Sequence, residues 1–334
     1  MRSSRKATLA IVFAVSTAWA PVAGAQQTPQ GFALERFYSS APGGGWLVMD
    51  SLDMHGGLGG AVSFTTGYAH DPLRVTDGVN HLSVVADQAF AEIGMAATYD
   101  RFRLYLNLDS PLVVQGQSGA VGGYQYLAPG VDPGSNPDTI SDARFGFDAR
   151  FLGEPGGPFR LGAGAQLIVS SGNRGDYASN VPADYLTDGT FRGFGRVLFA
   201  GDIGRLAYAG QLGVHIRPLD DSPAPGSPEG SELVFGVAAG PRLPVGRDAR
   251  AAFVLGPEIY GETAFRSFLG RETTGLEALL SGRFEGTGED GPQLRVKLGA
   301  GGGLNPHFGA PEWRMVFGIE LFDHQAGRAA RPGP

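Results

Sequence analysis

Charged side chains recur at every second position along much of this chain, opposite apolar ones. Between positions 142 and 151, for example, Phe145 and Phe147 alternate with Arg144 and Asp148. The alternation resumes after a Gly/Pro turn, with Ile168 as the one exception. A period of two predicts strands with one apolar face and one charged face. A row of charges of both signs can form ion pairs, order water or select among solutes.

Fifteen charged side chains fall by parity on the non-apolar face of these predicted strands. Two interpretations of this face remain open: the lining of an aqueous pore, or an interior partly closed by networks of ion pairs. The candidates are Arg103, Arg144, Asp148, Arg150, Arg192, Arg196, Arg217, Glu258, Glu262, Glu277, Arg283, Arg295, Lys297, Arg314 and Glu320.

Residues suited to covalent or metal chemistry are sparse. His70 and His81 flank a predicted loop near Ser83, a pattern more typical of turns than of a nucleophile with its base. The glycine run at 299–303 is not followed by the Lys-Ser/Thr of a phosphate loop, and in a strand such glycines mark close packing. The chain has no cysteine, which excludes disulfides and thiolate metal sites. We therefore assign no catalytic residue, metal or cofactor, and expect a protein that is not an enzyme.

The elements that carry the charged face are long enough to cross a bilayer. Each predicted strand has about ten or more residues, and a membrane-spanning β-strand needs about 9 to 11 tilted residues. The chain holds 54 Gly and 23 Pro, and after the N-terminal region it has no apolar run long enough for a membrane helix. The sequence therefore predicts an all-β fold, a transmembrane antiparallel up-and-down β-barrel of about twelve strands.

The connections between the predicted strands alternate between long and short. Long connections are predicted at 71–80, 117–138, 173–189, 220–231 and 266–272, and short ones at 100, 154–158, 204, 246–248 and 286–292. Bacterial outer-membrane barrels have long extracellular loops and short periplasmic turns. The alternation thus predicts which end faces out of the cell.

The chain divides into four predicted parts. Residues 1–25 have the basic start, apolar middle and small-residue end of a cleaved signal peptide, so we expect export to the bacterial outer membrane. Residues 26–56 are predicted as a periplasmic lead-in, whose apolar piece 46–49 forms either a periplasmic strand or a segment folded into the barrel mouth. Residues 57–322 form the barrel, and residues 323–334 a polar tail.

Charge excludes one class of partner. Without residues 1–25 the chain retains 23 basic and 33 acidic residues, a net charge of −10. Nucleic-acid binding calls for a basic face, so no nucleic-acid partner is expected. The expected partners are outer-membrane lipid, the machinery that inserts barrels into that membrane, and small solutes or an extracellular ligand at the loops.

Two segments resemble a known family. Residues 32–75, FALERFYSSAPGGGWLVMDSLDMHGGLGGAVSFTTGYAHDPLRV, and residues 99–114, YDRFRLYLNLDSPLVV, are similar to the N-terminal barrel of large OmpA-family outer-membrane proteins. In that family an Asp-rich linker and a peptidoglycan-binding domain typically follow the barrel. Nothing comparable follows Phe322, so the resemblance does not imply a wall-anchoring role.

Two functions from different classes follow from these patterns. The first is a porin-like passive channel for small solutes, because the predicted interior is polar. The second is a structural or surface-interaction barrel with a plugged lumen. Eight-stranded barrels fill their own interior and sixteen-stranded ones leave a channel, so about twelve strands leave both open.

Overall fold

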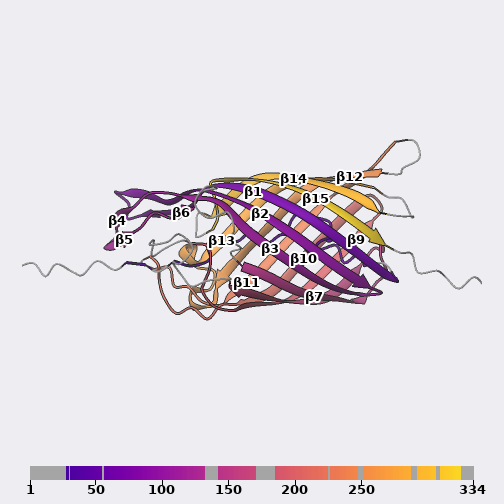
Figure 1. Ribbon diagram of the computed structural model, residues 1–334, viewed down its shortest axis with the longest axis horizontal. Coiled ribbons are helices and arrows are strands. Elements are labelled where there is room, and N and C mark those ends of the chain that lie inside the picture. The colour runs from indigo at the N-terminus through magenta and orange to yellow at the C-terminus, as the bar shows by residue number, and fades with distance from the viewer. Residues whose placement is uncertain are drawn as a thin grey trace, which may run out of the picture.

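Twelve long strands close into one antiparallel barrel (Figure 1). The computed structural model describes residues 28–29, 31–54, 56–131, 142–170, 185–224, 226–246, 251–286, 292–305 and 309–324. The predicted signal peptide and nearly all of the predicted C-terminal tail lie outside these residues. The barrel strands are β1 (Leu58–Thr76), β2 (His81–Tyr99), β3 (Phe102–Gln115), β7 (Asp142–Leu152), β8 (Arg160–Ser170), β9 (Arg192–Ile203), β10 (Leu206–Ile216), β11 (Glu232–Val245), β12 (Ala251–Ala264), β13 (Thr274–Gly286), β14 (Gln293–Asn305) and β15 (Trp313–His324).

Neighbouring barrel strands pair in chain order, and the first strand pairs with the last. Val62 of β1 lies opposite Leu321 of β15 and opposite Met95 of β2. β3 pairs with β7, and in the described part of the chain between them lie the short strands β4 (Gly119–Val121), β5 (Tyr124–Tyr126) and β6 (Gly130–Val131). The all-β, twelve-stranded barrel predicted from the period-two pattern is confirmed.

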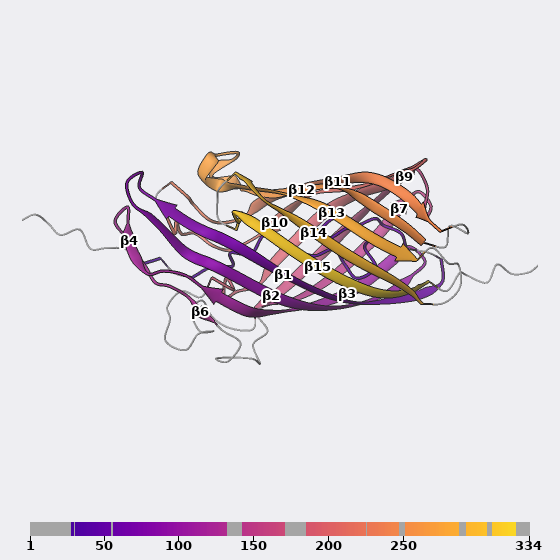
Figure 2. The same cartoon turned by 90° about the horizontal axis from the view of Figure 1, so that it is seen from above.

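The two ends of the barrel differ in their connections. We call the end with the connections after β2, β7, β9, β11 and β13 the short-turn end, and the opposite end the long-loop end. At the long-loop end the chain after β12 forms two 3₁₀ turns, η1 (Phe265–Ser267) and η2 (Arg271–Thr273). Figures 1 and 2 show β1 and β2 extending beyond the other barrel strands at this end, where β4 also lies.

One predicted loop is a strand. The loop predicted at 71–80 is reduced to a turn at 77–80, because β1 continues through Thr76. The pairing of β1 with β2 shifts register between His70 and Leu73, so Pro72 lies at an irregularity where its missing N–H costs no ladder bond. The pairing of β2 with β3 shifts register in the same way between Ala89 and Phe90.

The outer face of the barrel is apolar and the inner face is buried. Outward side chains remain exposed, among them Phe64, Ile93, Leu104, Phe145, Leu212, Leu280 and Met315. Among the described residues no helix is long and apolar enough to cross a membrane. An apolar outer belt on a closed barrel is the surface that a bilayer requires.

Residues 31–54, which we call the luminal segment, lie inside the barrel. Leu34 N–H donates to Tyr185 O at the long-loop end, while Asp53 accepts from Gly156 N–H at the short-turn end. The segment therefore passes through the whole lumen before β1 begins (Figure 1). Of the two alternatives for residues 46–49, the structure has a segment folded into the barrel and not a periplasmic strand. Inward-facing charges need partners once water is excluded, and the segment supplies them.

Candidate functional site

The fifteen predicted inward-facing side chains are all buried in the interior. Eleven of them contact the luminal segment: Arg103, Arg144, Arg150, Arg192, Arg196, Arg217, Glu258, Glu262, Arg283, Lys297 and Arg314. The other four contact neighbouring wall side chains, as in the Glu320 pairs with Arg295 and Lys297: Asp148, Glu277, Arg295 and Glu320. The face that was predicted either to line a pore or to be closed by ion pairs is thus, in this structure, a binding surface for another part of the same chain.

Asp50 of the luminal segment is held by two arginines of the wall. Arg103 Nη2 donates to its Oδ1 over 2.7 Å, and Arg196 Nη2 donates to its Oδ2 over 2.9 Å. Both arginines also bind Asp148 of β7, at 2.6 and 3.3 Å. The four side chains form a buried network in which each cation bridges one segment carboxylate and one wall carboxylate. Charge-assisted pairs of this kind are the strongest hydrogen bonds available to a protein.

Glu258 of β12 binds the backbone of the segment. Its Oε1 accepts from Leu47 N–H over 2.8 Å, and its Oε2 accepts from Val48 and Met49 N–H over 2.9 and 3.2 Å. The Glu258 side chain is fully buried. Three successive amides pointing at one carboxylate satisfy donors that would otherwise be orphaned in a dry interior.

A second group of ion pairs lies toward the long-loop end. Arg314 Nη2 donates to Glu35 of the segment over 2.8 Å and its Nε to Glu277 of the wall over 2.7 Å. Arg36 of the segment lies 3.3 Å from Glu232 and 3.5 Å from Glu262. Cations and anions therefore alternate between segment and wall.

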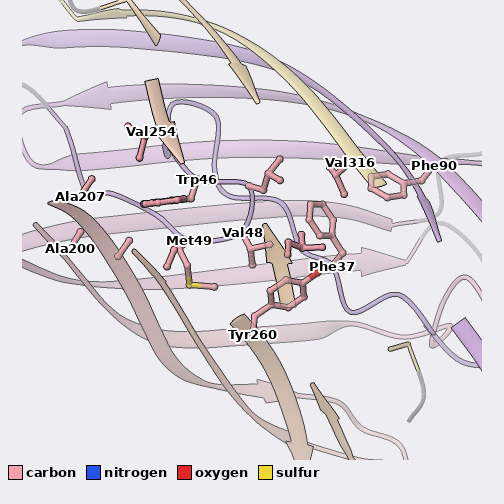
Figure 3. Packing of buried hydrophobic residues seen from close by; sticks show 14 residues of the cluster. Phe37, Trp46, Val48, Met49, Phe90, Ala200, Ala207, Val254, Tyr260 and Val316 are labelled. Carbon is pink, nitrogen blue, oxygen red and sulfur yellow. The ribbon is translucent and has the colours of Figure 1, made fainter. Parts of the chain in front are cut away.

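Glycines of the wall make room for side chains of the segment. A Cβ placed on Gly299 would lie 2.3 Å from Leu47 Cδ1, and one on Gly236 would lie 2.4 Å from Met49 Cε. Figure 3 shows Trp46, Val48 and Met49 packed against small wall residues. The close packing predicted for the glycine run at 299–303 is thus contact with the luminal segment at Gly299.

The luminal segment is not a strand of the barrel. Within the described chain, residues 33–54 make one backbone–backbone hydrogen bond to the rest of the protein, from Leu34 N–H to Tyr185 O over 3.2 Å. Their other described hydrogen bonds to the wall involve a side chain. Their remaining backbone–backbone bonds join two residues of the segment, as from Ser40 N–H to Leu47 O. The segment could leave the lumen without breaking any strand pairing.

Besides Glu232, the wall residues outside these fifteen that bind the segment include Glu92, Asn107 and Arg160. Glu92 of β2 accepts a hydrogen bond from Ser39 Oγ, and Asn107 of β3 donates to the same oxygen over 3.2 Å. Arg160 Nε donates to Ser51 O over 2.8 Å. Glu92 alternates with Ala91 and Ile93 in the sequence, so its parity placed it on the inner face.

His215, Glu232 and Glu262 have ligand atoms close enough to hold a metal ion. His215 Nδ1 lies 3.2 Å from Glu262 and 3.6 Å from Glu232. Two guanidinium groups already balance these carboxylates, because Arg36 contacts both and Arg217 Nη1 lies 3.1 Å from Glu232. These ion pairs account for the arrangement of His215, Glu232 and Glu262.

Glu229, in the connection after β10, is a buried carboxylate whose two oxygens have no hydrogen-bond partner in the described chain. Burial raises the pKa of Glu229 to about 8, from an ordinary value of 4.5. When the connection after β10 opens and exposes Glu229 to water, its carboxyl releases its proton as pH rises above about 4.5. In the closed connection the carboxyl keeps that proton up to about pH 8. The closed conformation therefore loses stability over this window, by a few kcal/mol in all, and Glu229→Gln should abolish the loss.

Hydrogen exchange of the Glu229 amide, which donates to Asp221 O, measures this effect. After correction for intrinsic exchange, Glu229→Gln should match the unmodified chain at pH 4 and be better protected at pH 9. Asp77→Asn is the control, because hydrogen bonds from the Asn80 and Val79 amides lower the pKa of exposed Asp77 to about 2, so its titration lies below this window. Equal protection of the Glu229→Gln variant and the unmodified chain at pH 9 would contradict the raised pKa of Glu229.

Comparisons with known proteins support the fold. No protein-family model and no curated protein sequence matches this chain. An outer membrane channel from Pseudomonas putida F1 superposes with a TM-score of 0.50 at 13% identity, covering 81% of this chain and 97% of that one. The NanC porin superposes with a TM-score of 0.44 at 7% identity, covering 78% of this chain and 98% of that one. At 13% identity, the likeness to the Pseudomonas channel shows the barrel fold and nothing finer.

Proposed function

We propose that this chain is an outer-membrane channel for small solutes, closed by its luminal segment and opened when that segment leaves the wall. The observation that carries the proposal is that the segment is bound by wall side chains and not by strand pairing. Its departure leaves the barrel intact and returns charged side chains to water, where they are stable. Twelve strands lie between the eight of barrels that fill their own interior and the sixteen of open channels, so a barrel of this size can be closed by one inserted segment.

The proposed setting is the bacterial outer membrane. The apolar outer face supports contact with membrane lipid, and insertion would use the machinery that assembles outer-membrane barrels. The long-loop end would face out of the cell and the short-turn end the periplasm. In this orientation the luminal segment enters from outside and ends near the periplasmic turns.

A disulfide between segment and wall tests the proposal. A Cβ built on Gly43 lies 3.4 Å from Ala61 Cβ in β1, close to the separation of about 3.5 to 4.5 Å that a disulfide needs. Gly43 has a φ of +80°, so a cysteine there costs about 1 to 2 kcal/mol. The chain has no cysteine of its own, so Gly43→Cys with Ala61→Cys can form one defined bond.

We expect single-channel recordings in a planar bilayer to show no openings of the oxidised double variant. Reduction should restore the openings of the unmodified chain. The double variant Gly43→Ser with Ala61→Ser should show the same openings under oxidising and reducing conditions. Unchanged current through the oxidised variant would mean that solute passes beside the segment, against the proposal. A chain silent in every state, including the opening variants discussed below, would instead be a structural or surface-interaction barrel of the OmpA kind.

A further inference from the structure

A cavity of about 510 Å³ opens at the long-loop end of the barrel. Its walls come from four parts of the chain: the ends of β1 and β2, the β4–β5 hairpin, the connection after β10, and η2. Small-molecule sites in proteins have volumes of about 300 to 1,000 Å³. The cavity is therefore large enough for a small organic ligand.

The floor of the cavity is apolar and continuous with the packing around the luminal segment. Val75, Val121 and Tyr126 line the cavity and belong to the same hydrophobic cluster as Phe32 and Leu34 of the segment. The Tyr126 hydroxyl donates to Pro223 O, so its ring presents an apolar face. An apolar ligand body would rest against the residues that seal the segment's outer end.

The rim of the cavity carries nitrogen donors that other side chains do not occupy. In the described chain, the side chains of Arg271 and His81 have no hydrogen-bond or ion-pair partner, while Arg74 pairs with Glu312 at 3.6 Å with both side chains over one-third exposed. The Asp77 carboxylate already accepts hydrogen bonds from residues 79 and 80. The other acidic side chain that lines the cavity is Glu272, whose carboxylate does not accept hydrogen bonds of this kind in the described chain.

We propose that this cavity binds a small amphipathic anion, with its apolar body on the floor and its carboxylate on Arg271 and His81. The inference deepens the proposed function, because it names the class of solute that would gather above the closed lumen. Binding itself does not depend on the channel opening. The two proposals can therefore fail separately.

The test uses 2-naphthoate and the full chain in nanodiscs of zwitterionic lipid, with lipid-only nanodiscs to subtract partitioning. Isothermal titration should show saturable binding that Arg271→Gln weakens by about tenfold, the loss expected for one charge-assisted hydrogen bond. Glu272→Gln should bind the anion at least as tightly, because it removes a repulsive charge. Uncharged 2-methylnaphthalene should bind more weakly than the anion.

Arg205→Gln, at the exposed turn after β9, is the matched control and should leave the affinity unchanged. The oxidised Gly43→Cys and Ala61→Cys variant should also bind 2-naphthoate, since its cavity is intact. Weaker binding by Glu272→Gln, or equal binding by Arg271→Gln, would overturn the proposed anion site. Binding without any conductance would uphold the site and reject the channel.

Discussion

Replacing Asp50 with alanine should open the barrel. The Asp50 carboxylate is buried and receives hydrogen bonds from both Arg103 and Arg196, so the variant removes two charge-assisted attachments between segment and wall. Truncating one partner of a buried ion pair costs about 3 to 5 kcal/mol. Here the two arginines keep Asp148, so most of the loss falls on the binding of the segment.

A loss of about 3 kcal/mol in segment binding should lower the ratio of closed to open channels by about a hundredfold. The open probability of single channels in a planar bilayer measures this ratio directly. Asp202→Ala is the matched control, because Asp202 is a wall acid that pairs with Arg160 and Arg242 and has no contact with the luminal segment in the described chain. If Asp50→Ala and Asp202→Ala gave the same low open probability, Asp50 would not be holding the lumen closed.

The barrel could be predicted because its strands obey a local rule. β7 and β8 span Asp142–Leu152 and Arg160–Ser170, close to the two halves of the hairpin that the alternation predicts. Period two assigns each residue to a face without any knowledge of its neighbours. The same rule placed Arg144 and Asp148 on the inner side, where the structure has them buried.

The luminal segment could not be predicted by that rule. Its residues have no regular period, and their partners lie far along the chain, as Leu47 and Glu258 do, 211 positions apart. Hydrogen bonds from wall side chains to an irregular backbone leave no periodic sequence pattern in the wall or in the segment. The loop predicted at 71–80 was also wrong over residues 71–76, because β1 continues through Pro72 to Thr76.

The sequence nevertheless held a signal for a filled interior. Leu198, Val254, Leu279 and Val316 fall on the inner face by parity, where a water-filled pore would favour polar residues, and each is at most 1% exposed. Ile168, the exception in the alternation of β8, is also buried on the inner side, in a cluster that packs against Tyr38 of the luminal segment. Apolar residues at inward positions indicate that protein, and not water, fills this part of the lumen.

Glu258→Gln should open the channel by a different route. Glutamine keeps one acceptor oxygen for three backbone N–H groups and turns its own N–H₂ toward them, so at least one amide of the segment loses its partner. The expected loss of about 2 kcal/mol lowers the closed-to-open ratio by about thirtyfold. Open probability is again the measurement. Glu320→Gln, a buried wall acid that pairs with Arg295 and Lys297, serves as the isosteric control.

The two opening variants should differ in the pore that they reveal. Asp50 leaves the lumen together with the segment, so Asp50→Ala should have the same ion selectivity as the brief openings of the unmodified chain. Glu258 stays in the wall and faces the vacated lumen, so Glu258→Gln should shift the reversal potential in a salt gradient toward anions. Equal selectivity of both variants would contradict a pore lined by Glu258. In the double variant the open probability should rise further but stop at full opening, because both residues act on the same segment.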